Sequence, residues 1–541
     1  MVYRMPEQDR TSWNTVIAAF ALSLVQSIPR HNPFPESPRG RYSTCTTRFH
    51  HFENDGVPIY WVSLDANTSK LVYKPTNAGD TIMDFSSVGY LGRDAKLPEV
   101  PVKVVLYPAR NCKDTNKSDG ESIQHAINEL SSLPLDPSTG FRGAIQLSSG
   151  DFDVRGHHFT INTSGILITG SSSSETILHA NVSIAEDGMD VHALFSVESP
   201  QQTIAEVGHR AAIVETVPSG SNYVKLDSSC GFKPGDLVSI VWPMTSRWIQ
   251  MMNMSERWGN FAVTSIERRV SRVNGEKNMV FLDIPVPFRV DLRYLSSSQP
   301  AYLVKVEISG RVSHVGLENF KAVQDKVLPV GRGTFLNIGQ VEDSWVRNVV
   351  AVDFGGDTMT VTGKRITVEG LNLIRTIPGP MKGPKFADLA IAFPGSQILV
   401  KNSVIQGGSS QFSYMTRDQA NGPNVFFNST AYGSSHAEPH AHFATGILYD
   451  SMKFENGTIS LRNRPYKHHG YTSGFSVVWN CHTKVLEVVK PPQAANWAIG
   501  NTIQSLGSTG NETLGFIEPR GIESPRLASL YLAQKAAAKM H

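Results

Sequence analysis

The chain has 541 residues, enough for one large solenoid with attachments or for about three ordinary domains. Charged residues make up 18% and hydrophobic residues 40%, a composition that argues against a disordered chain and against an integral membrane protein. The net charge of +2, from 50 basic and 48 acidic residues, argues against a nucleic-acid-binding protein, because such proteins carry a strong basic excess.

An apolar run stands near the start of the sequence, from Thr15 to Val25. It is too short to span a membrane comfortably, and it lies between Arg10 and the small polar residue Ser27. This arrangement predicts a secretory signal peptide over residues 1–29, with a short membrane anchor as the alternative. We therefore expect a secreted, extracellular protein without a membrane span.

Acceptor sites for N-linked glycosylation are spread along the chain and favour an extracellular glycoprotein. They begin at Asn67, Asn116, Asn162, Asn181, Asn253, Asn428, Asn456 and Asn511. The cysteines stand too far apart for a structural zinc site, and they leave room for one or two disulfides whose pairing stays open. They are Cys45, Cys112, Cys230 and Cys481.

The first part of the chain divides into two predicted regions. Residues 30–110 combine a flexible, Pro/Arg/Ser-rich lead-in with a small β cap of short alternating segments. Residues 111–224 are predicted to form the first coils of a β-solenoid, because short strands alternate with Gly and Ser turns. These coils open with a short helix from Ser118, whose apolar residues follow at helical spacing: Ile123, Ala126, Ile127 and Leu130.

Residues 225–300 interrupt this pattern and are predicted to be a β insertion. Its Met- and Trp-rich segment, residues 245–261, is expected to be a packed helix or loop that caps the solenoid, with a substrate-facing flap as the alternative. Residues 301–515 are predicted to form the main β-helix. Residues 516–541 are predicted to carry a C-terminal helix that caps the solenoid or covers its edge.

Strand-like segments of the main region end in Asn or Asp at intervals from 22 residues (450 − 428) to 30 residues (402 − 372). These positions are Asn319, Asn348, Asn372, Asn402, Asn428, Asp450 and Asn480. A repeat of this length marks a solenoid, because one coil cannot bury its apolar face alone. Asn and Asp tolerate the left-handed backbone of the turns, and stacked Asn side chains can hydrogen-bond. The fold predicted is therefore all-β, a single-stranded right-handed parallel β-helix.

Several stretches resemble known β-helix proteins. DGESIQHAIN, GAIQLSSGDFDV and GILITGSSSSETILHA resemble the opening of pectate-lyase-superfamily proteins. DFSSVGYLG, EPHAHFATGILYD, LRNRPYKHHGYTSG and VVWNC resemble a group of large, secreted, pectate-lyase-like β-helix proteins. The resemblance covers residues 80–530 and implies a right-handed parallel β-helix that holds a polysaccharide along its side.

The sequence departs from that group at two places. Relatives commonly show Pro-His-x-Arg-Trp where residues 439–443 read Pro-His-Ala-His-Phe. They show Gly-His-Gly-Trp where residues 468–471 read His-His-Gly-Tyr. If the arginine of the group acts in catalysis, its replacement by His442 implies lost activity or a changed substrate.

Residues 436–471 form the densest polar region and hold five of the 17 histidines. β-Elimination of a uronate needs a cation beside the carboxylate, a base that removes the C5 proton and an acid for the leaving oxygen. Imidazole titrates near working pH, so His440 or His469 suits the base. The predicted catalytic residues are His440, His442, Arg464 and His469, and the predicted substrate-binding residues are Glu438, Arg417, Lys467 and Tyr471.

Other readings of the polar residues stay open. His440 and His442 share one side of a strand and, with Glu438, could ligate a transition metal. Asp353 and Asp357 could serve as the acid and base of a glycoside hydrolase, could hold calcium, or could simply cap a turn. The polar region itself could be a hydrogen-bonded loop or a solvated face without catalytic function.

Three functions follow from these patterns. The first is an extracellular polysaccharide lyase, the second a glycoside hydrolase on the same scaffold, and the third a non-catalytic carbohydrate-binding β-helix protein. The expected partner is a polysaccharide, the expected state is a monomer, and calcium is the candidate cofactor.

Overall fold

The computed structural model describes residues 60–65, 67–68, 70–109, 118–182, 193–258, 263–324, 333–355, 357–376, 387–407, 412–433, 435–466, 468–518 and 527–539. The predicted signal peptide, the lead-in over residues 30–50, Cys45, Cys112, Asn116 and Lys467 lie outside these ranges. All described residues belong to one compact unit, Pro58–His541.

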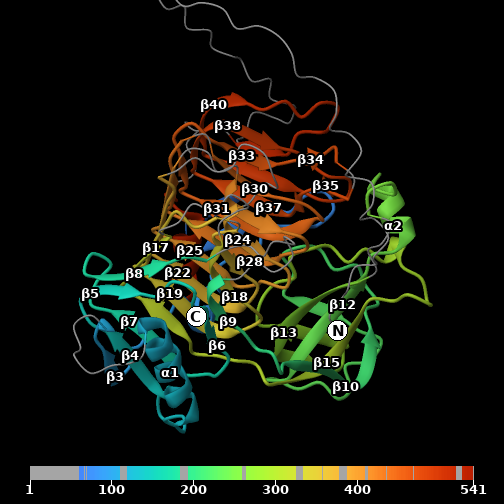
Figure 1. Ribbon diagram of the computed structural model, residues 1–541. Coiled ribbons are helices and arrows are strands. Elements are labelled where there is room, and N and C mark those ends of the chain that lie inside the picture. The colour runs from blue at the N-terminus through green and yellow to red at the C-terminus, as the bar shows by residue number, and fades with distance from the viewer. Residues whose placement is uncertain are drawn as a thin grey trace, which may run out of the picture. The chain divides into compact units, whose positions relative to one another are not determined.

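Stacked coils of parallel strands form a β-helix (Figure 1). One wall is a 13-stranded sheet, in which each strand pairs with the equivalent strand of the next coil. Its strands are β3 (Val102–Leu106), β4 (Gly143–Leu147), β7 (Ile166–Gly170), β16 (Gly316–Glu318), β19 (Glu342–Arg347), β22 (Lys364–Glu369), β25 (Ile398–Lys401), β28 (Asn421–Phe427), β31 (Ala444–Asp450), β36 (Ser473–Gly474), β37 (Ser476–Trp479), β39 (Asn496–Ile499) and β41 (Phe516–Glu518).

The remaining strands of the coils form an 18-stranded sheet with two columns. The first column holds β5 (Gly150–Asp153), β8 (Thr176–Ala180), β17 (Lys321–Gln324), β20 (Val350–Val352), β23 (Asn372–Ile374), β26 (Val404–Gln406), β29 (Thr430–Ala431) and β32 (Lys453–Phe454). The second holds β6 (Phe159–Ile161), β9 (Ala193–Val197), β18 (Thr334–Ile338), β21 (Met359–Val361), β24 (Ala387–Ala392), β27 (Phe412–Arg417), β30 (His436–Pro439) and β33 (Thr458–Leu461). In the last coils, β38 (His482–Val488) and β40 (Thr502–Leu506) continue both columns. The predicted right-handed parallel β-helix is confirmed.

The interior of the coils is one continuous apolar core that runs from Ile123 to Ala498. Helix α1 (Asp119–Ser132) contributes Ile123, Ala126, Ile127 and Leu130 to this core, as its helical spacing predicted. Ser118 caps the helix in a reciprocal arrangement with Glu121, so two backbone amides are satisfied at its start. The helix covers the first coils.

The turns that follow the 13-stranded sheet carry the predicted asparagines. Five have positive φ angles: Asn319, Asn348, Asn402, Asn428 and Asn480. Side-chain amides bond along the stack, from Asn348 to Asn319 at 3.2 Å and from Asn428 to Asn402 at 2.8 Å. The prediction is wrong at two coils, where Gly370 and Ser451 take the left-handed position and Asn372 and Asp450 lie in or at the end of a strand.

An antiparallel sheet is inserted between the coils of β9 and β16 (Figure 1). Its strands are β10 (Thr203–Ala212), β11 (Tyr223–Lys225), β12 (Leu237–Pro243), β13 (Val263–Asn274), β14 (Met279–Leu282) and β15 (Tyr302–Ser309). The sheet extends beyond residues 225–300 because β10 and β15 pair with each other across the insertion. Its apolar residues pack on the outer face of the 13-stranded sheet, against Leu399, Val425, Leu448 and Val477.

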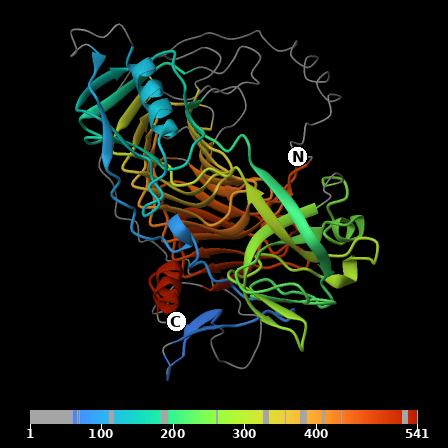
Figure 2. The same ribbon diagram turned by 90° about the horizontal axis from the view of Figure 1, so that it is seen from below.

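The chain from Tyr60 to Pro101, here called the strap, runs beside the coils in the reverse direction (Figure 2). Its hairpin, β1 (Val62–Leu64) and β2 (Leu71–Tyr73), lies at the last coils, where the Trp61 ring contacts the Phe516 ring with centroids 4.4 Å apart. Farther on, Tyr90 N donates to Thr367 and Leu91 N to Asp343. The predicted β cap is therefore a segment that follows the outer wall.

The C-terminal part differs from the predicted helix over residues 516–541. Phe516–Glu518 is the last strand, β41, and the helix α3 spans only Leu530–Ala538. α3 packs on the outer face of the 13-stranded sheet, where Tyr531 contacts Phe427 with ring centroids 5.4 Å apart. It thus covers the side of the solenoid. Among the described helices, none is both long and apolar enough to cross a membrane.

Candidate functional site

Polar residues gather where the second-column strands end. Arg417 ends β27, His440 follows β30, and Arg462 follows β33. These strands belong to successive coils and pair directly, so their ends stand in a row along the solenoid. His440 and His469 are 29 residues apart in the sequence, about one coil of the repeat, so the two histidines are expected to lie on neighbouring coils.

Glu438 is the centre of this cluster and has no exposed surface. Its carboxylate accepts a hydrogen bond from Arg462 Nη2 at 2.8 Å and another from Arg464 Nη1. Burial alone would raise the pKa of Glu438, but its contacts with His440 and with the two guanidinium charges keep it below its ordinary value. Glu438 therefore stays ionised and fixes both arginines, so it holds other residues in place instead of contacting a substrate.

His440 and His469 form a direct pair. Their Nε2 atoms are 3.2 Å apart, and the rings meet edge to face with centroids separated by 4.9 Å. Arg464 Nη1 lies 2.9 Å from His440 Nδ1. Because arginine can only donate, the neutral His440 accepts at Nδ1 and carries its proton on Nε2. That proton points at His469 Nε2, which is the acceptor of the pair.

The three arginine side chains of the site differ in how far they are exposed to solvent, which indicates different roles. The side chain of Arg464 is only 9% exposed, whereas those of Arg462 and Arg417 are 35% and 31% exposed. Burial lowers the pKa of Arg464, and its charge is compensated by Glu438. Arg464 thus orients His440 from the buried side of the site, while Arg462 and Arg417 can reach a molecule in solution.

His442 and Arg417 extend the site toward the preceding coil. His442 Nδ1 lies 2.9 Å from Asp418 Oδ1, and this hydrogen bond, with the nearby positive charges, lowers the pKa of Asp418. Arg417 forms a two-pronged ion pair with Asp357. When His440 is protonated, its charge lowers the pKa of Asp357, so the two groups lie near each other.

The remaining predicted residues lie differently. Tyr471 is buried, and its hydroxyl donates to Glu512 Oε2 at 2.5 Å. Burial and this carboxylate raise the pKa of Tyr471, which makes it a poor acid for a leaving oxygen. Tyr414, three residues before Arg417, lies in the core, where its hydroxyl donates to the carbonyl oxygen of Ser403.

The hypothesis that Asp353 and Asp357 are the acid and base of a glycoside hydrolase is weakened because both carboxylates already accept hydrogen bonds. Asp353 accepts from the backbone amide of Thr376 at 2.8 Å and also from its hydroxyl. Asp357 accepts from Ala387 N at 2.9 Å in addition to its ion pair with Arg417. Burial raises the pKa of Asp357. Both carboxylates therefore satisfy backbone amides, the arrangement expected of turn residues.

The positions of His440 and His442 also do not fit a transition-metal site. His440 turns to Arg464 and His469, whereas His442 turns to Asp418, so the two rings do not converge. Within the described ranges there is no group of three or more His, Cys, Asp or Glu residues that could hold a metal ion. Cys230 and Cys481 are free thiols.

The Met- and Trp-rich segment of the insertion contacts the site. From the sequence it was open whether this segment caps the solenoid or faces a substrate. It begins with the short helix α2 (Ser246–Met251) and ends at Trp258, which is 1% exposed. Arg257 and Trp258 bond to the backbone that carries Arg464 and His469. The segment is packed, in line with the expected helix or loop. Its aromatic residues were the sequence signal from which its contact with the site could have been found.

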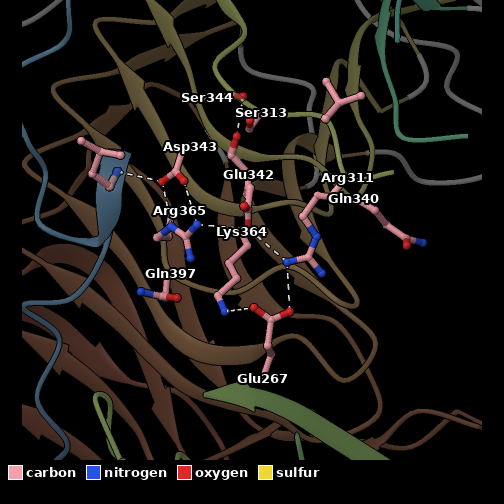
Figure 3. Close-up of polar contacts among 12 residues, drawn as sticks. Glu267, Arg311, Ser313, Gln340, Glu342, Asp343, Ser344, Lys364, Arg365 and Gln397 are labelled. Carbon is pink, nitrogen blue, oxygen red and sulfur yellow. Dashed lines mark hydrogen bonds and ion pairs between the residues drawn. The ribbon is translucent and has the colours of Figure 1, made fainter. Parts of the chain in front are cut away.

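A second charged cluster joins the insertion to the coils (Figure 3). Glu267 of β13 pairs with Lys364 and Arg311, and Arg311 also pairs with Glu342. Burial alone would raise the pKa of Glu267, but Lys364 and Arg311 lower it to about 2. Each charge in this chain of contacts has an opposite charge beside it, so the cluster is structural.

A pocket of about 690 Å³ lies within the insertion, between β12, β15 and α2. Among the described residues that line it, Arg210 is the charged one, and it pairs with Glu206 at 2.6 Å. The same described lining holds neither a histidine nor a carboxylate.

Known structures with related architecture include the tailspike gp49 of Pseudomonas phage LKA1, at 10% identity over 74% of this chain and 71% of that chain, with a TM-score of 0.33. The DFA-IIIase of Arthrobacter chlorophenolicus A6 has 11% identity over 80% and 88%, with a TM-score of 0.34. The A-module of the Azotobacter vinelandii mannuronan C-5 epimerase has 11% identity over 77% and 95%, with a TM-score of 0.29.

The sequence comparisons add no closer relation. No protein-family model matches the chain, and no curated protein matches it. The strand pairing of the β-helix itself establishes the fold, and the function has to be argued from the residues of its site.

Proposed function

We propose that this β-helix protein is an extracellular polysaccharide lyase that cleaves a uronic-acid-containing polymer by β-elimination on the side of the solenoid. One observation carries the proposal. His440 and His469 meet at 3.2 Å on a partly exposed surface, and a buried Arg464–Glu438 pair orients them. Such a pair combines an acceptor nitrogen with a donor N–H, which are the two groups that the elimination needs.

In this proposal His469 is the base and His440 the acid. His469 Nε2 takes the C5 proton of the uronate, and the electron pair forms the C4–C5 double bond. The C4–O bond breaks, and His440 Nε2–H gives its proton to the leaving oxygen. Arg462 and Arg417 are exposed enough to bind the uronate carboxylate, which makes the C5 proton more acidic.

A non-catalytic carbohydrate-binding protein is the second candidate, because the fixed charges of the site balance each other. Arg462, Arg464 and Arg417 carry three positive charges, and Glu438, Glu487 and Asp357 carry three negative charges at their sides. A site without a net positive charge binds a polyanion less strongly. A polymer would then be held without turnover.

The test uses the purified protein with a panel of uronate and neutral polysaccharides. A rising absorbance from an unsaturated product is the expected result, and His440→Gln and His469→Gln each lower the rate by about 100- to 10,000-fold. His482→Gln, at an exposed histidine of β38, is the control and keeps the wild-type rate. Full activity in both site variants contradicts the assignment. Reducing ends without unsaturation indicate a hydrolase, and binding without turnover indicates the second candidate.

A further inference from the structure

The hairpin that carries Arg464 and His469 is very short. Its strands are β34 (Asn463–Arg464) and β35 (Gly470–Tyr471), paired at two positions. A two-stranded hairpin of this size is not stable in water by itself. Other contacts must therefore fix the backbone from which the guanidinium and the imidazole project.

Arg257 of the insertion supplies the first of these contacts. Its Nη1 donates to Asn463 Oδ1 at 2.7 Å and to the carbonyl oxygen of Arg464 at 2.5 Å. Asn463 also donates to Glu512 at 2.6 Å. The strand is thus held from both sides at the residue whose side chain orients His440.

Trp258 supplies the second contact. Its indole Nε1 donates to the carbonyl oxygen of His469 at 3.0 Å, and this oxygen also accepts from His442 N at 3.2 Å. Gly470 has a φ of 66°, and a Cβ there would lie 2.5 Å from Met254 Sδ and 2.7 Å from Trp258 Nε1. The glycine lets the insertion approach the backbone beside the imidazole.

Aromatic packing holds Trp258 in place. Its ring stacks on Trp248 with centroids 5.8 Å apart and an interplanar angle of 12°. Phe443 contacts both rings, at 5.5 Å from Trp248 and 5.8 Å from Trp258. Phe443 directly follows His442, so the same cluster ties the loops of two coils together.

We infer that the inserted segment Thr245–Trp258 fixes the geometry of the histidine pair, with Arg257 and Trp258 as positioning residues for Arg464 and His469. The inference rests on the proposed function for its catalytic meaning. Both side chains donate to backbone oxygens of the hairpin, and Arg257 also donates to Asn463, so they act on the orientation of Arg464 and His469. A misplacement of about 1 Å in such a pair costs about 100-fold in rate.

The experiment compares Arg257→Ala and Trp258→Phe with wild type by NMR of isotope-labelled histidine in the full-length protein. The ring-nitrogen shifts report which nitrogen carries the proton. Wild type is expected to show His440 protonated at Nε2 and His469 at Nδ1, assigned with the single glutamine variants. Trp258→Phe retains an aromatic ring but removes the Nε1–H donor together with part of the ring volume. Both variants are expected to mix these proton positions. Arg247→Ala and Tyr223→Phe, at exposed side chains of the same insertion, are the controls.

Kinetics provide the second measurement. If the protein turns over a uronate polymer, Arg257→Ala and Trp258→Phe lower kcat by about 100-fold while KM stays constant. Histidine signals that remain at wild-type positions in both variants overturn the inference, as do equal shifts in the control variants. Shifted signals in a protein without any turnover support the inference and count against the proposed function. If Trp258→Phe does not fold, Arg257→Ala decides the question.

Discussion

Asp450 is a buried carboxylate at the end of β31 that receives the start of helix α3. It accepts from Tyr531 N, from the hydroxyl of Ser529 and from that of Ser451, each at 2.8 Å. Burial raises its pKa from 3.8 to about 6, although the hydrogen bonds act in the opposite direction. The ionised form is therefore held at a cost in the folded protein.

This shift predicts how Asp450→Asn changes stability with pH. Between pH 3.8 and about 6 the folded state keeps a proton that the unfolded state releases, so the contribution of Asp450 to stability falls as pH rises. The amide resembles the protonated acid. At about pH 8 we expect Asp450→Asn to have a free energy of unfolding roughly 2 kcal/mol above that of wild type, and therefore a higher unfolding temperature. At about pH 4 we expect the two proteins to be equally stable. Thermal unfolding at both values measures this, and a lower Tm at about pH 8 contradicts it.

Single residues show what the sequence could and could not predict. The pairing of His440 with His469 follows from an interval of about one coil, so their neighbourhood was predictable. The partner of Asp450 is a helix 80 residues away, and nothing in a turn pattern indicates that contact. Asp450 was therefore predicted as a turn residue, while Ser451 takes the left-handed backbone.

At the scale of the elements, the asparagine turns combine two effects. Asn348 has a φ of 54°, and its side-chain amide donates to Asn319 at 3.2 Å. A left-handed backbone costs an ordinary residue about 1–2 kcal/mol, whereas glycine adopts it freely. The hydrogen bond adds about 1 kcal/mol.

Two substitutions separate these effects. Asn348→Gly removes the hydrogen bond and keeps the backbone freedom, so it is expected to lower the free energy of unfolding by about 1 kcal/mol. Asn348→Ala removes both and is expected to lower it by about 2–3 kcal/mol. Denaturant unfolding measures the two values. Equal losses in both variants would show that the backbone conformation contributes nothing.

The elements of the coils were predictable because each repeats the same short pattern. The insertion was predictable as an interruption, but its bounds were not. β15 alternates apolar and polar residues over much of its length, whereas β10 is mostly exposed, and their pairing with each other assigns both to the antiparallel sheet. The contact of Arg257 with the site depends on how that sheet packs, which no local pattern describes.

At the scale of the whole molecule, the charged cluster of Figure 3 attaches the insertion to the coils. The side chains of Glu267 and Lys364 are 19% and 14% exposed, and Arg311 joins them at 3.0 Å. Removing one member of such a group leaves an opposite charge buried without compensation. The insertion is thus fixed by charge as well as by its apolar face.

We expect Glu267→Gln to lower the free energy of unfolding by up to about 3 kcal/mol, because Lys364 loses its partner. Glu276→Gln, at an exposed glutamate of the same hairpin, is the control and changes stability by less than about 0.5 kcal/mol. Denaturant unfolding of both variants measures the difference. A wild-type midpoint for Glu267→Gln would show that Glu342 alone compensates the basic residues.

The strap gives this solenoid a property that stacked repeats ordinarily lack. In a simple array each repeat touches only its neighbours, so the terminal repeats can fray while the middle stays intact. Here one segment binds the final coils through Trp61 and Glu518, and then enters the first coil as β3. Opening either end therefore loosens a tie that the other end shares. The two extremities of the molecule melt together, and a protease that cuts the tie once weakens both.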